Sequence, residues 1–188
     1  MEKHNSFHFL ILLVLTVFIL SSCMLPAAHV TISPHVQLSA IKTVAVWKFR
    51  DGGSIANSGD IATTAIESAF MEKGFRLVSY SKIRDILSIE IGYREGMSLD
   101  AGMLTPKVLS HIREETGGDT IILGSVSGAW CNMAYMPPCW IECSFKMIDL
   151  RSGEIVISAN VSDDGYSLQS AAQQMAEKAV SKLQDGSI

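Results

Sequence analysis

The chain has 188 residues and a formal net charge of −4, so it lacks the basic field that draws proteins to nucleic acid. Its 14 Gly and 5 Pro residues are too few to suggest disorder, and the length suits one compact domain with a hydrophobic core.

The first element along the chain is an unbroken apolar run over residues 9–20 (FLILLVLTVFIL), followed directly by residues 20–23 (LSSC). A run of about a dozen apolar residues fits a secretory signal peptide and is short for a bilayer span. The alternative is an ordinary cysteine near the end of a transmembrane segment. We predict a signal peptide over residues 1–22.

Residues 20–23 resemble the lipobox of bacterial lipoproteins. The resemblance implies that the signal peptidase cuts before Cys23, and that Cys23 carries acyl chains such as palmitate on its thiol and its new amino group. Two or more chains give a stable anchor, because each buried methylene contributes roughly 0.8 kcal/mol. Met24 stands where inner-membrane enteric lipoproteins carry Asp, so the resemblance favours the outer membrane, with the domain facing the periplasm.

The mature chain is predicted to begin with a lipidated tether over residues 23–40, which has no clear hydrophobic period, and to continue as one domain over residues 41–188. Residues 41–49 (IKTVAVWKF) predict a central strand that is buried on both faces. A loop over residues 50–58 precedes a helix with a stripe of small and apolar residues, which Gly74 ends as a left-handed cap.

A short strand over residues 75–78 and two further helices are predicted next. Ser79 or Ser81 caps the first of these helices, and Thr105 caps the second, with a proline at its first helical position. Three strands follow, over residues 120–126, 140–148 and 154–162. The last two alternate apolar and polar residues and are joined by a tight turn over residues 149–153 (DLRSG), and a final helix covers residues 167–184.

The predicted order is therefore β-α-β-α-α-β-β-β-α. This order predicts an α/β fold of α+β character, in which helices pack on a mixed β-sheet. The sheet is parallel in character at the start of the chain and meander-like later.

This order and several local motifs resemble the periplasmic domain of the CsgG family, whose fold is similar to the N-terminal domain of TolB. The motifs lie at residues 44–49 (VAVWKF), 59–62 (GDIA), 75–78 (FRLV), 118–126 (GDTIILGSV) and 148–155 (IDLRSGEI). The resemblance spans most of the mature chain. It implies a non-catalytic outer-membrane lipoprotein that takes part in secretion or in assembly of surface fibres, as in curli assembly.

The chain departs from the pore-forming members of that family. A membrane strand needs about 9–11 alternating residues. Residues 128–139 offer only a short hairpin tip, and residues 92–102 are short and polar, so we expect no channel from this chain alone. Smaller lipoproteins of the same domain type do not form pores, and those of the LpoB type activate a peptidoglycan synthase. An LpoB-like activator is the alternative function.

The three cysteines of the mature chain beyond the lipobox lie close together in sequence. An odd number in an oxidising compartment suggests one disulfide and one free or intermolecular thiol. Cys131 could pair with Cys139 or with Cys143. A three-cysteine metal site is disfavoured, because no histidine lies nearby and the spacing matches no zinc pattern.

No set of side chains with the pattern of a nucleophile, a base and an acid stands out, so we expect no enzyme. His111 is interpreted as a solvated helix residue, and the pair Asp163-Asp164 as a turn before the last helix rather than a cation site. Residues 50–53 (RDGG) lack the Lys-Ser/Thr of a phosphate-binding loop. We expect no metal, no cofactor other than the covalent lipid on Cys23, and no small-molecule substrate.

The segment that most favours a functional role is residues 130–140 (WCNMAYMPPCW). Apolar side chains at a loop tip stay hydrated unless something covers them, and Trp, Tyr and Met are typical interface anchors. One hypothesis is a surface that docks an envelope protein or another copy of the chain; the other is that the tip folds back and completes the core. The candidate docking residues are Trp130, Met133, Tyr135, Met136 and Trp140.

Overall fold

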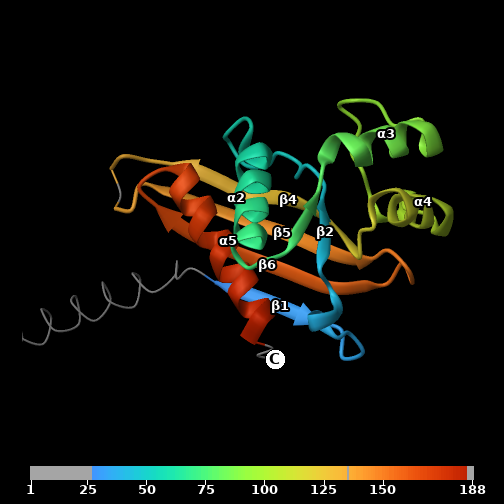
Figure 1. Ribbon diagram of the computed structural model, residues 1–188. Coiled ribbons are helices and arrows are strands. Elements are labelled where there is room, and N and C mark those ends of the chain that lie inside the picture. The colour runs from blue at the N-terminus through green and yellow to red at the C-terminus, as the bar shows by residue number, and fades with distance from the viewer. Residues whose placement is uncertain (1–26, 135, 186–188) are drawn as a thin grey trace, which may run out of the picture.

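The computed structural model describes residues 27–134 and 136–185 (Figure 1). The predicted signal peptide, Cys23 and Tyr135 lie outside the described residues. The strands are β1 (Ala28–Ile32), β2 (Thr43–Val46), β3 (Arg76–Val78), β4 (Thr120–Cys131), β5 (Cys139–Asp149) and β6 (Ile155–Gly165), and the helices are α2 (Ser58–Glu72), α3 (Tyr80–Ile91), α4 (Pro106–Thr116) and α5 (Leu168–Asp185).

The strands form one mixed sheet in the order β1-β6-β5-β4-β2-β3. β2 runs parallel to both β3 and β4, whereas β4, β5, β6 and β1 pair antiparallel in succession. This arrangement confirms the predicted mixed sheet with packed helices. Helical crossovers separate β2, β3 and β4, which permits parallel pairing, and short connections join β4 to β5 and β5 to β6; β1 pairs with β6 from the other end of the chain.

The two faces of the sheet are covered unequally. Helices α2 and α5 lie side by side across one face (Figure 1), where their stripes of small residues bring them close to the sheet. Helices α3 and α4 cover the other face only near β2, β3 and the start of β4, in a second core around Trp47 and Ile112. Beyond them, this second face of β5, β6 and β1 presents polar side chains such as Lys146, Ser158 and Asn160.

The predicted tether over residues 23–40 extends too far along the chain. Residues 28–32 form the edge strand β1, which pairs with β6 from Ala28 opposite Val161 to Ile32 opposite Ile157. The backbone oxygen of Ala27 also accepts a hydrogen bond from the Ser162 amide, at 2.8 Å. The folded domain therefore includes residues 28–32 rather than beginning at residue 41.

Most other boundaries match the local signals. Thr105 caps α4 by accepting a hydrogen bond from the Val108 amide, Pro106 opens that helix, and Gly117 ends it in the left-handed region. Strand β4 continues to Cys131, five residues beyond the predicted end (131 − 126), because it pairs with β5 along its whole length. No helix in the described part of the chain combines the length and the apolar character that a membrane span requires.

Candidate docking surface at the β4–β5 tip

The connection between β4 and β5, residues 132–138, is called the tip. Met133 and Met136 are 85% and 84% exposed, so the hypothesis that the tip completes the core is wrong for these two side chains. Both lie where apolar surface remains in contact with water unless another surface covers it. Docking of a partner at the tip stays a prediction.

The two tryptophans among the candidate docking residues lie at the base of the tip rather than at its end. Trp130 and Trp140 occupy directly paired positions on β4 and β5, and both are half-buried. The Trp140 ring lies against Gly128, where an added Cβ would come within 2.6 Å of the ring. The glycine therefore makes room for the indole, which covers backbone on its own sheet.

A disulfide joins the strands where the tip begins. Of the two pairings considered, the structure has Cys131 bonded to Cys139, at directly opposed positions of β4 and β5. Cys143 is a free, buried cysteine. Burial, with a smaller contribution from the Glu142 charge, raises the pKa of the Cys143 thiol to about 12, which keeps it neutral and unreactive near neutral pH.

A third exposed apolar side chain lies at the same end of the sheet. Cys139 pairs with Gly165 at the end of β6, and the next residue, Tyr166, is 81% exposed. Sequence patterns did not single out Tyr166, because only the register of β5 with β6 brings it to the tip. We refer to Met133, Met136 and Tyr166 as the apolar end.

The loop over residues 50–58 supports the strand that leads into the tip. Both the amide and the hydroxyl of Ser54 donate to the Ala129 carbonyl, at 3.2 and 3.1 Å. Gly53 has φ +73°, and a Cβ there would meet the Ala129 backbone at 2.4 Å. Only glycine permits both this backbone conformation and this close approach, so the loop is fitted against β4.

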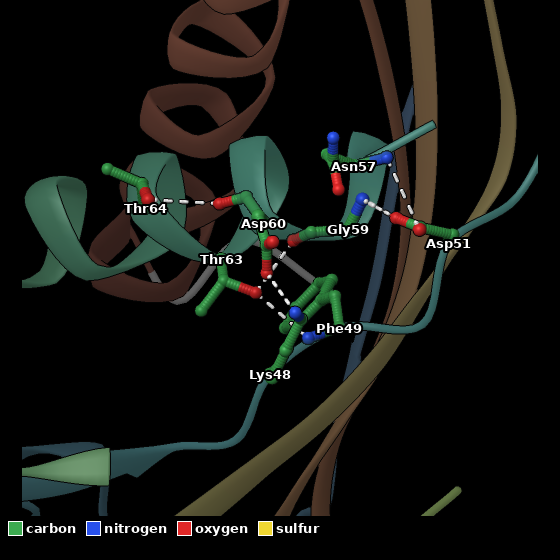
Figure 2. Close-up of polar contacts among 8 residues, drawn as sticks. All are labelled: Lys48, Phe49, Asp51, Asn57, Gly59, Asp60, Thr63 and Thr64. Carbon is green, nitrogen blue, oxygen red and sulfur yellow. Dashed lines mark hydrogen bonds and ion pairs between the residues drawn. The ribbon is translucent and has the colours of Figure 1, made fainter. Parts of the chain in front are cut away.

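The same loop is fixed to the start of α2 by a polar network (Figure 2). Asp51 accepts hydrogen bonds from the amides of Gly59 and Asn57, at 2.7 and 3.3 Å, so its carboxylate caps the helix from seven positions before Ser58 (58 − 51). Asn57, at the formal cap position, has φ 61° and makes no side-chain cap bond. This role of Asp51 was not predicted.

Figure 2 also shows three contacts made by residues 48 and 49 and by Thr63. The Thr63 hydroxyl accepts from the Phe49 amide and donates to the Gly59 carbonyl, at 2.8 and 2.7 Å. Lys48 and Asp60 form an exposed ion pair at 2.8 Å, which contributes little because water and salt screen it. The network joins the segment that follows β2, the loop over residues 50–58 and α2 into one support for β4.

Replacing Gly59 by Ala is expected to destabilise the protein. Helix propensity alone predicts a gain of about 1 kcal/mol, but an added Cβ would lie 2.2 Å from the Phe49 carbonyl oxygen. Because the clash is with backbone, we expect a net loss of about 1–3 kcal/mol in thermal unfolding. Gly102→Ala, which would meet no atom within 4 Å, is the control; equal melting temperatures for the two variants would contradict the close packing at Gly59.

Two acidic side chains, Glu90 and Asp163, form ion pairs that join neighbouring elements of the fold. Glu90 on α3 accepts from Lys107 and His111 on α4, at 2.8 and 2.9 Å, and these hydrogen bonds, that of Lys107 first, lower the pKa of Glu90. Asp163 is buried within β6 and pairs with Lys178 of α5 at 2.5 Å, so the prediction of a turn at residues 163–164 was wrong. The described residues hold no group of three or more His, Cys, Asp or Glu side chains that could bind a metal ion.

An apolar hollow lies at the opposite end of β1 from the tip. Its volume is about 660 Å³, and its lining includes Ile32 at the end of β1, Phe70 near the end of α2 and Leu183 near the end of α5. Sequence patterns gave no sign of it, because it forms between three segments that are distant along the chain.

No protein-family model matches the chain, and no curated protein matches it. Among solved structures, the PelC dodecamer from Paraburkholderia phytofirmans is similar, with a TM-score of 0.58, 18% identity, and coverage of 85% of this chain and 98% of that chain.

Two further solved structures are also similar. The hypothetical protein CT253 from Chlamydia trachomatis has a TM-score of 0.50 and 8% identity, with 77% of this chain and 96% of that chain covered. The LpoB C-terminal domain from Escherichia coli has a TM-score of 0.48 and 18% identity, with 69% and 86% covered. The likenesses to PelC and CT253 show a shared α+β fold, and none of the three supports the CsgG family in particular.

Proposed function

We propose that this chain is a lipid-anchored protein of the cell envelope, facing the periplasm from the outer membrane, that binds other proteins and catalyses no reaction. The observation that carries the proposal is the lipobox-like segment at residues 20–23, which only residues 24–27 separate from β1. An acyl chain on Cys23 would therefore hold a folded domain directly at a membrane surface.

Within this role we consider two functions. The first is a component of a secretion or assembly machine, which the CsgG-like order of motifs in the sequence implies and which the similar structures do not favour. Self-association is one form that such a component could take, and the similar PelC structure is a dodecamer. The uncovered polar face of β5, β6 and β1 offers a surface for a neighbouring protein, because α3 and α4 leave it open. Its centre contains Thr31, Ser158 and Lys146, which lie opposite one another across the three strands.

The alternative is a regulator of a peptidoglycan synthase, similar in role to LpoB. Both functions need an anchored domain with a free protein-binding surface, so fold alone does not choose between them. They differ in the partner, which is an export component or further copies of the chain in the first case and a cell-wall synthase in the second.

Affinity purification of the full-length acylated protein, after cross-linking in intact cells, tests the proposal. We expect either a defined homo-oligomer or a single co-purified envelope machine. Thr31→Arg should reduce the cross-linked product several-fold, whereas Thr64→Arg, at an exposed threonine of α2, should leave it unchanged. A purely monomeric product with no cross-linked partner would contradict the proposal, and increased activity of a co-purified peptidoglycan synthase would establish the alternative.

A further inference from the structure

The point where the chain enters the fold lies at the same end of the sheet as the tip. In Figure 1 the start of β1 and the connection between β4 and β5 are both on the left, whereas α3 and α4 are on the right. The register agrees with this view, because Ala28 pairs with Val161 and Cys139 pairs with Gly165 on the same strand, β6. Ala27, which is hydrogen-bonded to Ser162, therefore lies on the side of Ala28 that is nearer the tip end of β6.

The length of chain before β1 limits how far a membrane could lie from the tip. Four residue steps separate Ala27 from Cys23 (27 − 23), so Cys23 lies within about 14 Å of Ala27 at full extension. Ala27 is hydrogen-bonded to Ser162, and three steps along β6 to Gly165, where the tip begins, cover about 10 Å. The acylated residue and the tip are thus restricted to the same end of the domain.

The chemistry of the tip matches a lipid interface. Residues 131–138 (CNMAYMPP) contain no Asp, Glu, Lys or Arg, so no charge need be desolvated if they enter the headgroup region. Met133, Met136 and Tyr166 are all more than four-fifths exposed. Methionine adds a flexible apolar side chain, and tyrosine is typical of the boundary between lipid and water.

We infer that the apolar end inserts into the surface of the membrane that holds the acyl chains of Cys23. The domain would then stand on the bilayer with the tip end of its sheet against the membrane. The inference rests on the lipid anchor proposed above. It makes the tip a second, non-covalent membrane contact that fixes the orientation of the domain. The disulfide between Cys131 and Cys139 and the loop over residues 50–58 hold β4 and β5 rigid, so the two methionines are presented together.

This orientation also determines where the other surface features of the domain would lie relative to the membrane. The apolar hollow beside Ile32 lies at the far end of β1 and would face away from the membrane. The uncovered polar face, with Thr31 and Ser158, would stand roughly perpendicular to the bilayer. Neighbouring copies or an envelope partner could then reach it from the side.

Depth-dependent fluorescence quenching tests this contact on the full-length acylated protein. The protein is reconstituted into vesicles of phosphatidylethanolamine and phosphatidylglycerol, with and without brominated acyl chains. The added indole of Met136→Trp should be quenched at least three-fold more strongly than that of Ile89→Trp, a matched control that is 77% exposed on α3. Tyr166→Trp provides a second reporter if Met136→Trp does not fold.

The possible outcomes distinguish failure of the tip insertion from failure of the lipid anchor at Cys23. If the protein floats with the vesicles but the added indoles of Met136→Trp and Tyr166→Trp are quenched no more than that of Ile89→Trp, the insertion is refuted and the anchor stands. If brominated lipid does not quench the added indoles, but an added envelope protein shields them from a water-soluble quencher, protein docking replaces lipid insertion. If the chain carries no acyl group and does not float, both the anchor and the insertion are refuted.

Discussion

Replacement of Phe49 by Ala is expected to cause the largest loss of stability among single substitutions that leave the backbone intact. The side chain is 1% exposed and lies in the core beneath α2, with its ring 6.2 Å from that of Phe145. Truncation of a buried Phe to Ala typically costs about 3–5 kcal/mol, from lost apolar burial and from the cavity left behind. The expected fall in melting temperature is roughly 6–20 °C at 2–4 °C per kcal/mol.

The effect at Phe49 should be specific to its position. The ring lies over Gly124 of β4, where an added Cβ would be 2.4 Å from ring atoms, so the two residues are fitted to each other. Met71→Ala, which removes a 55% exposed apolar side chain from α2, is the control and should change the unfolding free energy by less than about 0.5 kcal/mol. Similar losses for Phe49→Ala and Met71→Ala would contradict the described core.

Removal of the disulfide is expected to have the second-largest effect. Loop-closure entropy for a separation of 8 residues between Cys131 and Cys139 predicts a loss of about 2–3 kcal/mol in the double variant Cys131→Ala/Cys139→Ala. At 2–4 °C per kcal/mol, the melting temperature should fall by roughly 4–12 °C. Thermal unfolding followed by circular dichroism, without reductant, measures this change.

Reductant provides the matched control for the disulfide. Wild-type protein treated with a dithiol should lose stability to the same extent as the double variant, whereas the double variant should not respond. Cys143→Ala should remain sensitive to reductant, because the buried thiol of Cys143 takes no part in the bond. Loss of that sensitivity in Cys143→Ala would show that Cys143 is a disulfide partner instead.

The sequence predicted those parts of the fold that local signals determine. Thr105 and Pro106 mark the start of α4 by capping geometry, and the turn over residues 149–153 is stabilised within itself, where Asp149 accepts from the amides of Arg151 and Ser152 at 2.7 Å. Alternation along β5 and β6 likewise follows from one covered and one open face. Each of these features depends on residues that are neighbours in the chain.

Features that depend on distant pairing were missed or misplaced. Strand β1 is held by β6, and the hydrogen bond from the Ala27 amide to the Ser162 hydroxyl joins residues 135 positions apart. Its own sequence (AHVTI) is short and only partly buried, so it resembles a linker. Asp163 looked like part of a turn because its partner, Lys178, lies on the following helix.

At the candidate site, too, the sequence predicted local features but not those that depend on pairing between distant segments. The apolar composition of residues 130–140 left open whether they form a docking surface or complete the core, and it did not show which members are exposed. The structure separates Met133 and Met136 at the end from Trp130 and Trp140 at the base, and adds Tyr166 through the register of β5 with β6. The support from Asp51 could not be predicted from capping rules, because the capping carboxylate precedes the helix by a whole loop.

The most direct test of the account is the mass of the N-terminal peptide of the mature protein, purified from membranes and digested. An anchored envelope protein requires a peptide that begins at Cys23 and carries acyl chains, and requires that Cys23→Ala abolish both the cleavage and the added mass. A mature chain that begins elsewhere, or an unmodified Cys23, would contradict the anchor and the membrane orientation that depends on it.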